Sequence, residues 1–456
     1  MSEFLFKAIL QEDGWQENVV IKTNTKGIVE SICSDCERKG FRDFAVPGFQ
    51  NAHSHAFQYA MAGLAELHSV SNSKLQNDFW SWRKAMYDLA LNITPNQMEN
   101  IASMLYKEML RNGYTHVAEF HYLHHDLNGG RYDNLSEMGE RIVAAAKRTG
   151  IKLTLIPIFY QNGGFGRPAE KQQRRFISNS LDNYLKLLEA SNLSAKNYEE
   201  ASVAYGIHSM RAVSPENIIA LTKIKSENIP LHIHVSEQLK EIQDSIDFLG
   251  ARPVEWLNRN VQLDNDFHLV HATHLVDEEI NAIARSGANV VLCPSTEGNL
   301  GDGLFPLNSF LIKGGKWSIG TDSHVGLNPF EELRILDYGQ RLVTHNRNTF
   351  GNNLSGDNGN IALANALING RKAMGVNQKA YFEIGKSLDA LVISEEHPLV
   401  NLTSVKNLSN MLVYSSDPSM YKGSLVNGQW KILNGQHKDD QIHEKFIQTL
   451  SELKVR

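Results

Sequence analysis

Short strand-like runs and longer helical segments alternate along most of this chain, and this alternation limits its possible folds most strongly. The strand-like runs are rich in Val, Ile, Leu and aromatic residues, whereas segments such as 94–113 and 134–150 have apolar residues at helical spacing. Strands connected by helices run parallel, and eight such units close into a barrel. We therefore expect an α/β fold, a (β/α)8 TIM-like barrel. Its predicted strands lie within residues 43–55, 114–122, 151–160, 201–209, 230–237, 267–274, 288–295 and 316–324.

Both ends of the chain have a different pattern. Residues 4–44 contain short strand-like runs separated by turn residues, and the segment after Gly385 returns to the same pattern. A chain of 456 residues is long enough for one large domain and a smaller one. The sequence predicts a barrel in residues 47–385 and a small β-sandwich domain built from residues 1–46 and 386–456 together.

Charge and hydropathy narrow the possible partners. The net charge is −6, and no segment gathers the Lys and Arg residues that nucleic acid or an anionic membrane attracts. No 18 apolar residues occur in succession, and the N-terminus lacks the basic flank and apolar stretch of a secretion signal. We expect a cytoplasmic protein that binds neither nucleic acid nor membranes. Cys33 and Cys36 form an isolated C-x-x-C, for which a turn between strands is a better interpretation than a zinc or redox site.

Polar side chains gather where the predicted strands end. In a TIM-like barrel the catalytic groups lie at this end, in the loops that lead into the helices. Histidine is unusually frequent there, and several histidines at one face of one barrel favour a metal site. The residues at the strand ends are His53, His55, Glu119, His121, Tyr122, His208, Arg211, His232, His234, Glu237, His271, His274, Asp322, Ser323 and His324.

Three histidines and one aspartate are the candidate metal ligands. His53 and His55 are two residues apart, so their side chains project to the same side of a strand. With His234 and Asp322 they supply a donor set that suits Zn²⁺ or Fe²⁺ and leaves a position for water. We predict one divalent ion, with zinc favoured and ferrous iron as the alternative. Taken singly, Asp322 could instead be a helix N-cap, and His271 a buried core imidazole.

The order and spacing of these motifs resemble the amidohydrolase superfamily, in its mononuclear deaminase branch. The resemblance rests on His53-x-His55, His234-x-x-Glu237, His271 and Asp322. Longer segments are similar to those of formimidoylglutamate deiminases: "NAHSHAFQYAMAGLAE", "FWSWRKAMYDLAL", "AEFHYLHHD", "IHSMRAV", "CPSTEGNLGDGLFP" and "GTDSHVGLNPFEELRILDYGQRL". Amidohydrolases with two metals commonly bridge them with a modified lysine from the fourth strand. Residues 201–214 contain no lysine, which favours a single metal.

The resemblance implies a reaction and the residues that catalyse it. The family replaces the imine nitrogen of N-formimidoyl-L-glutamate by oxygen, which yields N-formyl-L-glutamate and ammonia in histidine degradation. Asp322 would bind the metal and accept a proton from the attacking water. His271 would hydrogen-bond that water and stabilise the tetrahedral centre, and Glu237 would carry a proton to the leaving nitrogen.

The resemblance also implies how the substrate is held. Its two carboxylates require cationic partners, preferably arginines that bind in a bidentate manner. Five positions match substrate-binding residues of the family: Gln58, Arg83, Tyr122, His208 and Arg211. A homodimer is a further expectation from the family.

Two rival hypotheses remain. The first is another deaminase of the same superfamily, acting on a purine, pterin or adenosine-derived substrate. A flat ring favours aromatic stacking, whereas Arg83 and Arg211 favour a dicarboxylate. The second is a catalytically silent barrel that serves as a binding module. The complete set of predicted ligands, together with Glu237 and His271, argues against it.

Overall fold

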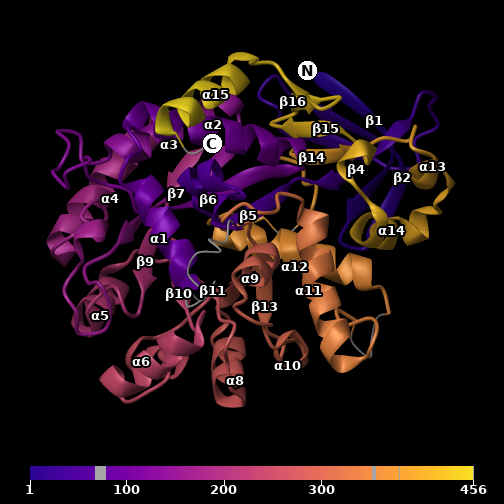
Figure 1. Ribbon diagram of the computed structural model, residues 1–456. Helices are drawn as coiled ribbons and strands as arrows, with labels where there is room; N and C mark the ends of the chain where they lie inside the picture. The colour runs from indigo at the N-terminus through magenta and orange to yellow at the C-terminus, as the bar shows by residue number, and fades with distance from the viewer. Residues whose placement is uncertain (67–78, 352–355, 379, 455–456) are drawn as a thin grey trace.

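The eight predicted barrel strands are present in the structure, a computed structural model that describes residues 1–66, 79–351, 356–378 and 380–454 (Figure 1). All eight pair in parallel, in the order of the chain, and a parallel bridge between Ser54 and Asp322 connects the first strand to the end of the last. The α/β barrel fold is therefore confirmed. Its strands are β5 (Phe49–Ser54), β6 (Tyr114–His121), β7 (Lys152–Phe159), β9 (Tyr205–Ser209), β10 (Leu231–Val235), β11 (Phe267–His271), β12 (Asn289–Leu292) and β13 (Lys316–Ile319), and the short β8 (Ala201–Val203) pairs with β7.

Helices form the outer ring of the barrel and cover its strands (Figure 1). Every residue of β10 is buried, as expected for a parallel strand enclosed on both faces. The helices of this ring and its loops are α1 (Phe79–Ala90), α2 (Pro95–Arg111), α3 (Glu137–Thr149), α4 (Leu181–Ala195), α5 (Pro215–Ile224), α6 (Leu239–Leu249), α7 (Pro253–Asn260), α8 (Asp277–Ser286), α9 (Pro294–Leu300), α10 (Leu307–Ile312), α11 (Pro329–Thr344) and α12 (Asn358–Ala373).

The sequence determines where α2 begins. The Thr94 hydroxyl accepts the Gln97 backbone N–H at 3.4 Å, while the Gln97 side chain accepts the Thr94 N–H at 3.0 Å. This reciprocal cap satisfies two N–H groups that the first helical turn leaves without partners, and Pro95 suits the first helical position. The apolar side of α2 is buried, including Met98, Ile101 and Leu105. Capping and periodicity therefore agree for this helix.

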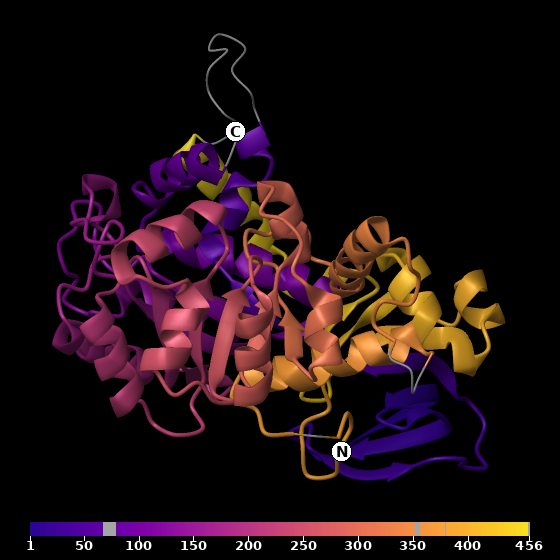
Figure 2. The same ribbon diagram turned by 90° about the horizontal axis from the view of Figure 1, so that it is seen from below.

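The two ends of the chain build a second sheet beside the barrel, where indigo and yellow segments lie side by side (Figure 2). The strand β4 (Arg42–Pro47) joins them, because it pairs in parallel with β1 and antiparallel with β14. The predicted small β domain from both ends is therefore confirmed, as one continuous sheet. Its other strands are β1 (Ser2–Gln11), β2 (Gly14–Thr23), β3 (Val29–Cys33), β14 (Ala390–Ile393), β15 (Tyr421–Val426), β16 (Gln429–Leu433) and β17 (Gln436–His437).

The remaining helices lie in the C-terminal part of the chain. They are α13 (Pro398–Leu402), α14 (Leu408–Ser415) and α15 (Gln441–Leu453). The last of them, α15, packs on α2, where Asn100 donates a hydrogen bond to the Thr449 hydroxyl at 3.1 Å. Cys33 and Cys36 form a disulfide across the turn after β3. Among the described helices, none combines the length and the apolar character that a membrane span requires.

The C-terminal end of α12 closes the N-terminal end of the barrel. The Ala373 carbonyl accepts a hydrogen bond from His232 Nε2 at 2.9 Å, and the Met374 carbonyl accepts one from the Thr154 hydroxyl at 3.2 Å. Thr154 lies in β7 and His232 lies near the start of β10. This contact leaves the opposite end of the barrel, where the strands finish, for the functional site.

Candidate metal centre

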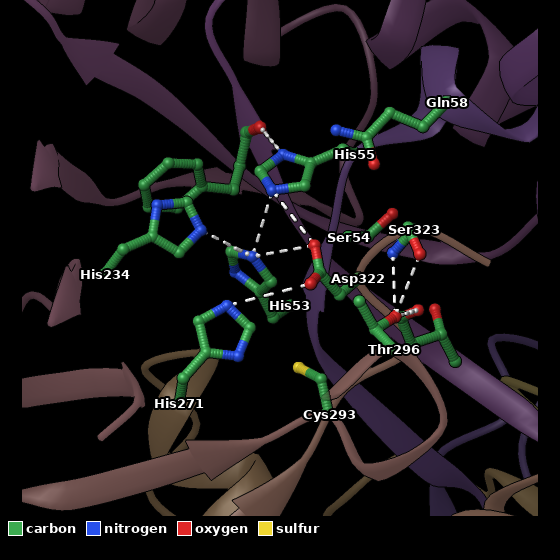
Figure 3. Close-up of polar contacts among 12 residues, drawn as sticks. His53, Ser54, His55, Gln58, His234, His271, Cys293, Thr296, Asp322 and Ser323 are labelled. Carbon is green, nitrogen blue, oxygen red and sulfur yellow. Dashed lines mark hydrogen bonds and ion pairs between the residues drawn. The ribbon is translucent and has the colours of Figure 1, made fainter. Parts of the chain in front are cut away.

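The four predicted metal ligands converge at the C-terminal ends of the barrel strands (Figure 3). His53 Nε2 lies 3.1 Å from His55 Nε2 and 3.0 Å from His234 Nε2. Asp322 Oδ1 lies 3.2 Å from His55 Nε2 and 3.5 Å from His53 Nε2. All four residues are buried. His53 lies in β5, His55 directly follows it, His234 lies in β10, and Asp322 lies in the turn after β13, so closure of the barrel brings them together.

Backbone hydrogen bonds between the end of β5 and the turn after β13 hold Asp322 against His53 and His55. The N–H groups of Thr321 and Asp322 both donate to the His53 carbonyl, at 3.1 and 3.0 Å. Asp322 has a φ of 46°, a left-handed conformation that is uncommon for residues other than glycine and is found at turns and functional sites. This turn directs the carboxylate into the barrel. An Asp at the end of a strand was visible in the sequence, but its conformation was not.

The hydrogen bonds of two of these imidazoles leave lone pairs that suit a cation. His55 Nδ1 donates to the Phe120 carbonyl at 2.8 Å, and His234 Nδ1 donates to the His208 carbonyl at 2.9 Å. In a neutral ring the other nitrogen then carries a lone pair, so His55 Nε2 and His234 Nε2 are both acceptors. These two nitrogens and the Asp322 carboxylate are all acceptors that face His53 Nε2. One proton on His53 cannot serve all three acceptors. The donor set therefore fits a divalent metal ion.

Burial and neighbouring charges keep these groups in the forms that bind metal. Burial lowers the pKa of His53 to about 3, and burial with the adjacent imidazoles holds the pKa of His234 well below its usual value. Burial alone would raise the pKa of Asp322, but its contacts with His53 and His55 hold that pKa well below the usual value. His53 and His234 are therefore neutral and Asp322 is ionised, which are the ligand forms that a metal requires.

His271 and Glu237 lie at the edge of the candidate metal ligands. His271 Nε2 is 3.7 Å from Asp322 Oδ2 and 4.0 Å from Glu237 Oε1, close to both carboxylates but beyond direct hydrogen-bond distance. Burial opposes a charge on His271, but Glu237, Glu297 and Asp322 raise its pKa to about 10. Burial raises the pKa of Glu237. The two groups can therefore supply and receive protons beside the ligands.

Glu297 is a residue whose role the sequence did not assign. Its Oε1 lies 3.3 Å from His271 Nδ1 and also accepts the Cys293 backbone N–H at 2.9 Å. Glu297 lies in α9 and is buried. It fixes the ring of His271 so that Nε2 faces Asp322 and Glu237. The only signal in the sequence was its place in "CPSTEGN" after the seventh barrel strand.

Glu119 supports the strand end that carries His53 and His55. Its carboxylate accepts hydrogen bonds from the Ser54 hydroxyl at 2.7 Å, the Ala56 N–H at 2.5 Å and the Tyr106 hydroxyl at 3.0 Å. Burial raises the pKa of Glu119 to about 7 despite these donors. Ser54 therefore points away from the two histidines on either side of it. Beyond β13, the Thr296 hydroxyl contacts that of Ser323, the residue after Asp322 (Figure 3).

A cavity beside the candidate metal ligands contains all five predicted substrate-binding residues. Gln58 donates to the Tyr122 hydroxyl at 3.0 Å, and Arg83 donates to the Tyr87 hydroxyl at 2.7 Å. Burial and the charge of Arg211 hold the pKa of His208 well below its usual value. The cavity is lined by His55, Gln58, Trp82, Arg83, Met86, Tyr87, Tyr122, Tyr160, Phe176, His208, Arg211, His234, Glu237, His271, Leu300 and Asp322.

Other histidines near the strand ends contact groups other than the side chains of the four candidate ligands. His124 contacts the Ile158 carbonyl at 3.1 Å, His125 contacts the Ile177 carbonyl at 2.8 Å, and His324 contacts the Thr321 hydroxyl at 2.9 Å. His121 is buried against His124, and His274 lies in the loop after β11. One ring nitrogen each of His124, His125 and His324 is occupied by these contacts. Leaving them out of the ligand set agrees with the geometry.

Comparison with known proteins identifies the family of this barrel. A model described as "Amidohydrolase family" matches residues 44–431. The chain belongs to the amidohydrolase family. This amidohydrolase is 40% identical to the formimidoylglutamate deiminase of Pseudomonas aeruginosa over 460 aligned residues, covering 99% of this chain and 100% of that protein. The expected resemblance to formimidoylglutamate deiminases is confirmed, and with it a hydrolase acting on C–N bonds.

Other relatives and solved structures match along most of the chain. The amidohydrolase is 25% identical to a 5-methylthioadenosine/S-adenosylhomocysteine deaminase of Thermodesulfovibrio yellowstonii, over 88% of this chain and 84% of that protein. A crystal structure of an amidohydrolase from Brucella melitensis superposes with a TM-score of 0.92 and 38% identity, covering 100% of both chains. Atrazine chlorohydrolase from Arthrobacter aurescens, solved with zinc, superposes with a TM-score of 0.81 but only 18% identity, over 99% of this chain and 100% of that one, so it shows the fold alone.

Proposed function

We propose that this amidohydrolase converts N-formimidoyl-L-glutamate and water to N-formyl-L-glutamate and ammonia, a step of histidine degradation. The observation that carries the proposal is the 40% identity to a formimidoylglutamate deiminase along the full chain. The cavity agrees with this substrate, because Arg83 and Arg211 line it together with the candidate metal ligands His55, His234 and Asp322. Two guanidinium groups match the two carboxylates of the substrate.

We assign His53, His55, His234 and Asp322 to one metal ion and propose zinc. Three neutral imidazoles and one carboxylate suit Zn²⁺, and ferrous iron is the alternative ion for this donor set. When bound, such an ion supplies a Lewis acid that makes water nucleophilic near neutral pH. Measurement of the metal content of the purified protein decides between the two ions.

The side chains of this chain then move the protons. Water adds to the amidine carbon of the substrate, and Asp322 accepts the proton that this water loses. His271, held by Glu297, donates a hydrogen bond toward the oxygen of the tetrahedral centre. As the water adds, Glu237 protonates the imine nitrogen to an amine. The proton held by Asp322 then passes to this amine, the C–N bond breaks, ammonia leaves, and the hydroxyl proton of the tetrahedral centre returns to Glu237. Burial suits Glu237 to this task, because it raises the pKa and lets the carboxyl carry a proton closer to neutral pH.

The substrate-binding residues position the amidine carbon. We assign the carboxylates of the substrate to Arg83 and Arg211, and the amino-acid and formimidoyl groups to Gln58, Tyr122 and His208. Tyr122 and His208 are neighbours, with ring centroids 5.6 Å apart, and the His208 ring also lies beside that of His234. The residues proposed to bind the substrate therefore lie directly beside a proposed metal ligand. A homodimer and a cytoplasmic location remain predictions.

Ammonia release by the purified, zinc-loaded protein tests the proposal. We expect rapid release from N-formimidoyl-L-glutamate and none from guanine or adenosine. The flat rings of these purines offer no carboxylate to Arg83 and Arg211. Release from a purine, with none from N-formimidoyl-L-glutamate, would assign the protein to the rival deaminases. N-formimidoylglycine, which lacks the second carboxylate, should react more slowly.

A further inference from the structure

Two tyrosines and a glutamine form a buried cluster on the cavity wall beside Arg83. Tyr87 lies in α1, Tyr160 directly follows β7, and Gln173 ends the short 3-10 helix η3 (Lys171–Gln173). Their exposed fractions are 7%, 2% and 0%, and both tyrosines line the cavity of the metal centre. No pattern in the sequence selects any of the three, because they lie on separate segments.

The backbone fixes the orientation of the Gln173 amide. Its Oε1 accepts the Glu170 N–H at 2.8 Å. The amide nitrogen therefore faces the two tyrosines, and Nε2 donates to the Tyr160 hydroxyl at 2.8 Å and to the Tyr87 hydroxyl at 3.2 Å. Both phenol oxygens act as acceptors toward Gln173. Their own protons must be directed elsewhere.

Tyr87 has a second donor on its oxygen. Arg83 Nε donates to it at 2.7 Å, so this phenol oxygen accepts two N–H groups. Among the described residues, neither the Tyr87 nor the Tyr160 hydroxyl has an acceptor for its proton. Burial raises the pKa of Tyr87, so the hydroxyl keeps its proton. A buried O–H without an acceptor is costly, and here both O–H groups border a cavity.

We infer that the Tyr87 and Tyr160 hydroxyls donate hydrogen bonds to one carboxylate of the substrate, beside Arg83, and that Gln173 and Arg83 orient them for this contact. The inference rests on the proposed function and adds two substrate-binding residues to it. The wall formed by Arg83, Tyr87 and Tyr160 presents only donors to the cavity. Such a surface binds an anion and rejects a neutral group that cannot accept as many hydrogen bonds.

Three substrates and two variants test the inference. The substrates are N-formimidoyl-L-glutamate, N-formimidoyl-L-glutamine, which has a neutral amide in place of the distal carboxylate, and N-formimidoyl-4-aminobutyrate, which lacks the α-carboxylate. We expect Tyr87→Phe and Tyr160→Phe each to lower kcat/KM for the glutamate compound by about 10- to 100-fold, the loss typical of a hydrogen bond to a charged group. On the substrate that lacks the contacted carboxylate, parent and variants should react equally. Tyr205→Phe, at the start of β9, is the matched control.

A binding measurement separates this inference from the proposed function. Glutarate is a dicarboxylate without a reactive group, and calorimetric titration of the zinc-loaded protein measures its Kd. We expect both variants to bind glutarate at least about 10-fold more weakly than the parent. Equal glutarate affinity, or an equal loss of turnover on all three substrates, would overturn the inference. A parent protein that releases no ammonia from N-formimidoyl-L-glutamate would instead contradict the proposed function.

Discussion

Two histidines of the same strand, His232 and His234, do different work at the two ends of one barrel. Both lie in β10, two residues apart, so both project to the same side of the strand. His234 is one of three imidazoles that converge with Asp322. His232 lies near the start of the strand and stacks on His268, with ring centroids 4.7 Å apart. One histidine belongs to the candidate metal centre and the other closes the opposite end.

The difference between them lies in which ring nitrogen carries the proton. His232 uses Nε2, the outer nitrogen, to donate to the Ala373 carbonyl at the end of α12. His234 uses Nδ1, the inner nitrogen, to donate to the His208 carbonyl, which leaves the Nε2 lone pair facing the other candidate ligands. A neighbouring backbone carbonyl therefore decides whether a buried histidine can bind metal. Residue type and strand position alone do not decide whether it binds metal.

Replacing each of the two histidines should give the largest difference, in metal content and turnover. His234→Ala removes a proposed ligand, so we expect complete loss of turnover and less than one equivalent of bound metal. His232→Asn leaves all four proposed ligands in place, so its metal content and kcat should stay close to those of the parent. Elemental analysis and ammonia release measure both properties. Metal loss in His232→Asn, or full activity in metal-free His234→Ala, would contradict the ligand assignment.

Glu237→Gln should give a smaller effect. The amide cannot carry a proton to the leaving nitrogen, so kcat should fall by about 10²- to 10⁴-fold, the usual range for a general acid or base. Glu237 is not one of the four proposed ligands, so bound metal should remain at one equivalent. Steady-state kinetics and elemental analysis test this. A loss of metal equal to that of His234→Ala would instead place Glu237 among the ligands.

Protonation of His232 at low pH should give the smallest of these effects, a decrease in the free energy of unfolding. Burial lowers the pKa of His232 to about 4, below the value near 6.5 expected in the unfolded chain. The folded state therefore binds fewer protons than the unfolded state between these values, and this stabilising contribution is lost as the pH falls from about 6.5 to about 4. The slope is about 1.4 kcal/mol per pH unit for one proton.

Urea unfolding of the metal-free parent and of metal-free His232→Asn measures this contribution. The free energy of unfolding of the parent should fall more steeply below a pH of about 6.5 than that of the variant, because an asparagine side chain does not titrate. Histidines away from His232 titrate alike in both proteins and cancel in the difference, whereas His268, which stacks on His232, contributes to it. An identical pH dependence in the two proteins would show that His232 does not control acid stability.

Much of the barrel could be predicted, because its signals are local. Each strand has an apolar run, and α2 has a cap and an amphipathic pattern that depend on a few neighbouring residues. The convergence of the candidate ligands was also predictable, since His53, His55, His234 and Asp322 each end a predicted barrel strand. Parallel strands of one barrel bring their ends to one face, so the positions of these residues along the chain imply their meeting.

The loops of the site were less predictable. Glu297, Tyr87 and Gln173 have no pattern of their own in the sequence, and each also has a partner on another segment. The same holds for His232. Its sequence position resembles that of a metal ligand, but in the structure its Nε2 donates to a carbonyl at the end of α12. Long-range hydrogen bonds of this kind leave no periodicity for the sequence to reveal.

The sequence by itself determined the alternation of strands and helices, the donor types at the strand ends and the likeness to formimidoylglutamate deiminases. Only the tertiary structure decided which of these donors face one another and which ring nitrogen each histidine leaves free. The physical reason is that hydrophobic periodicity acts within one element, whereas the tautomer of a histidine and the direction of a phenol proton depend on groups that folding brings from distant parts of the chain.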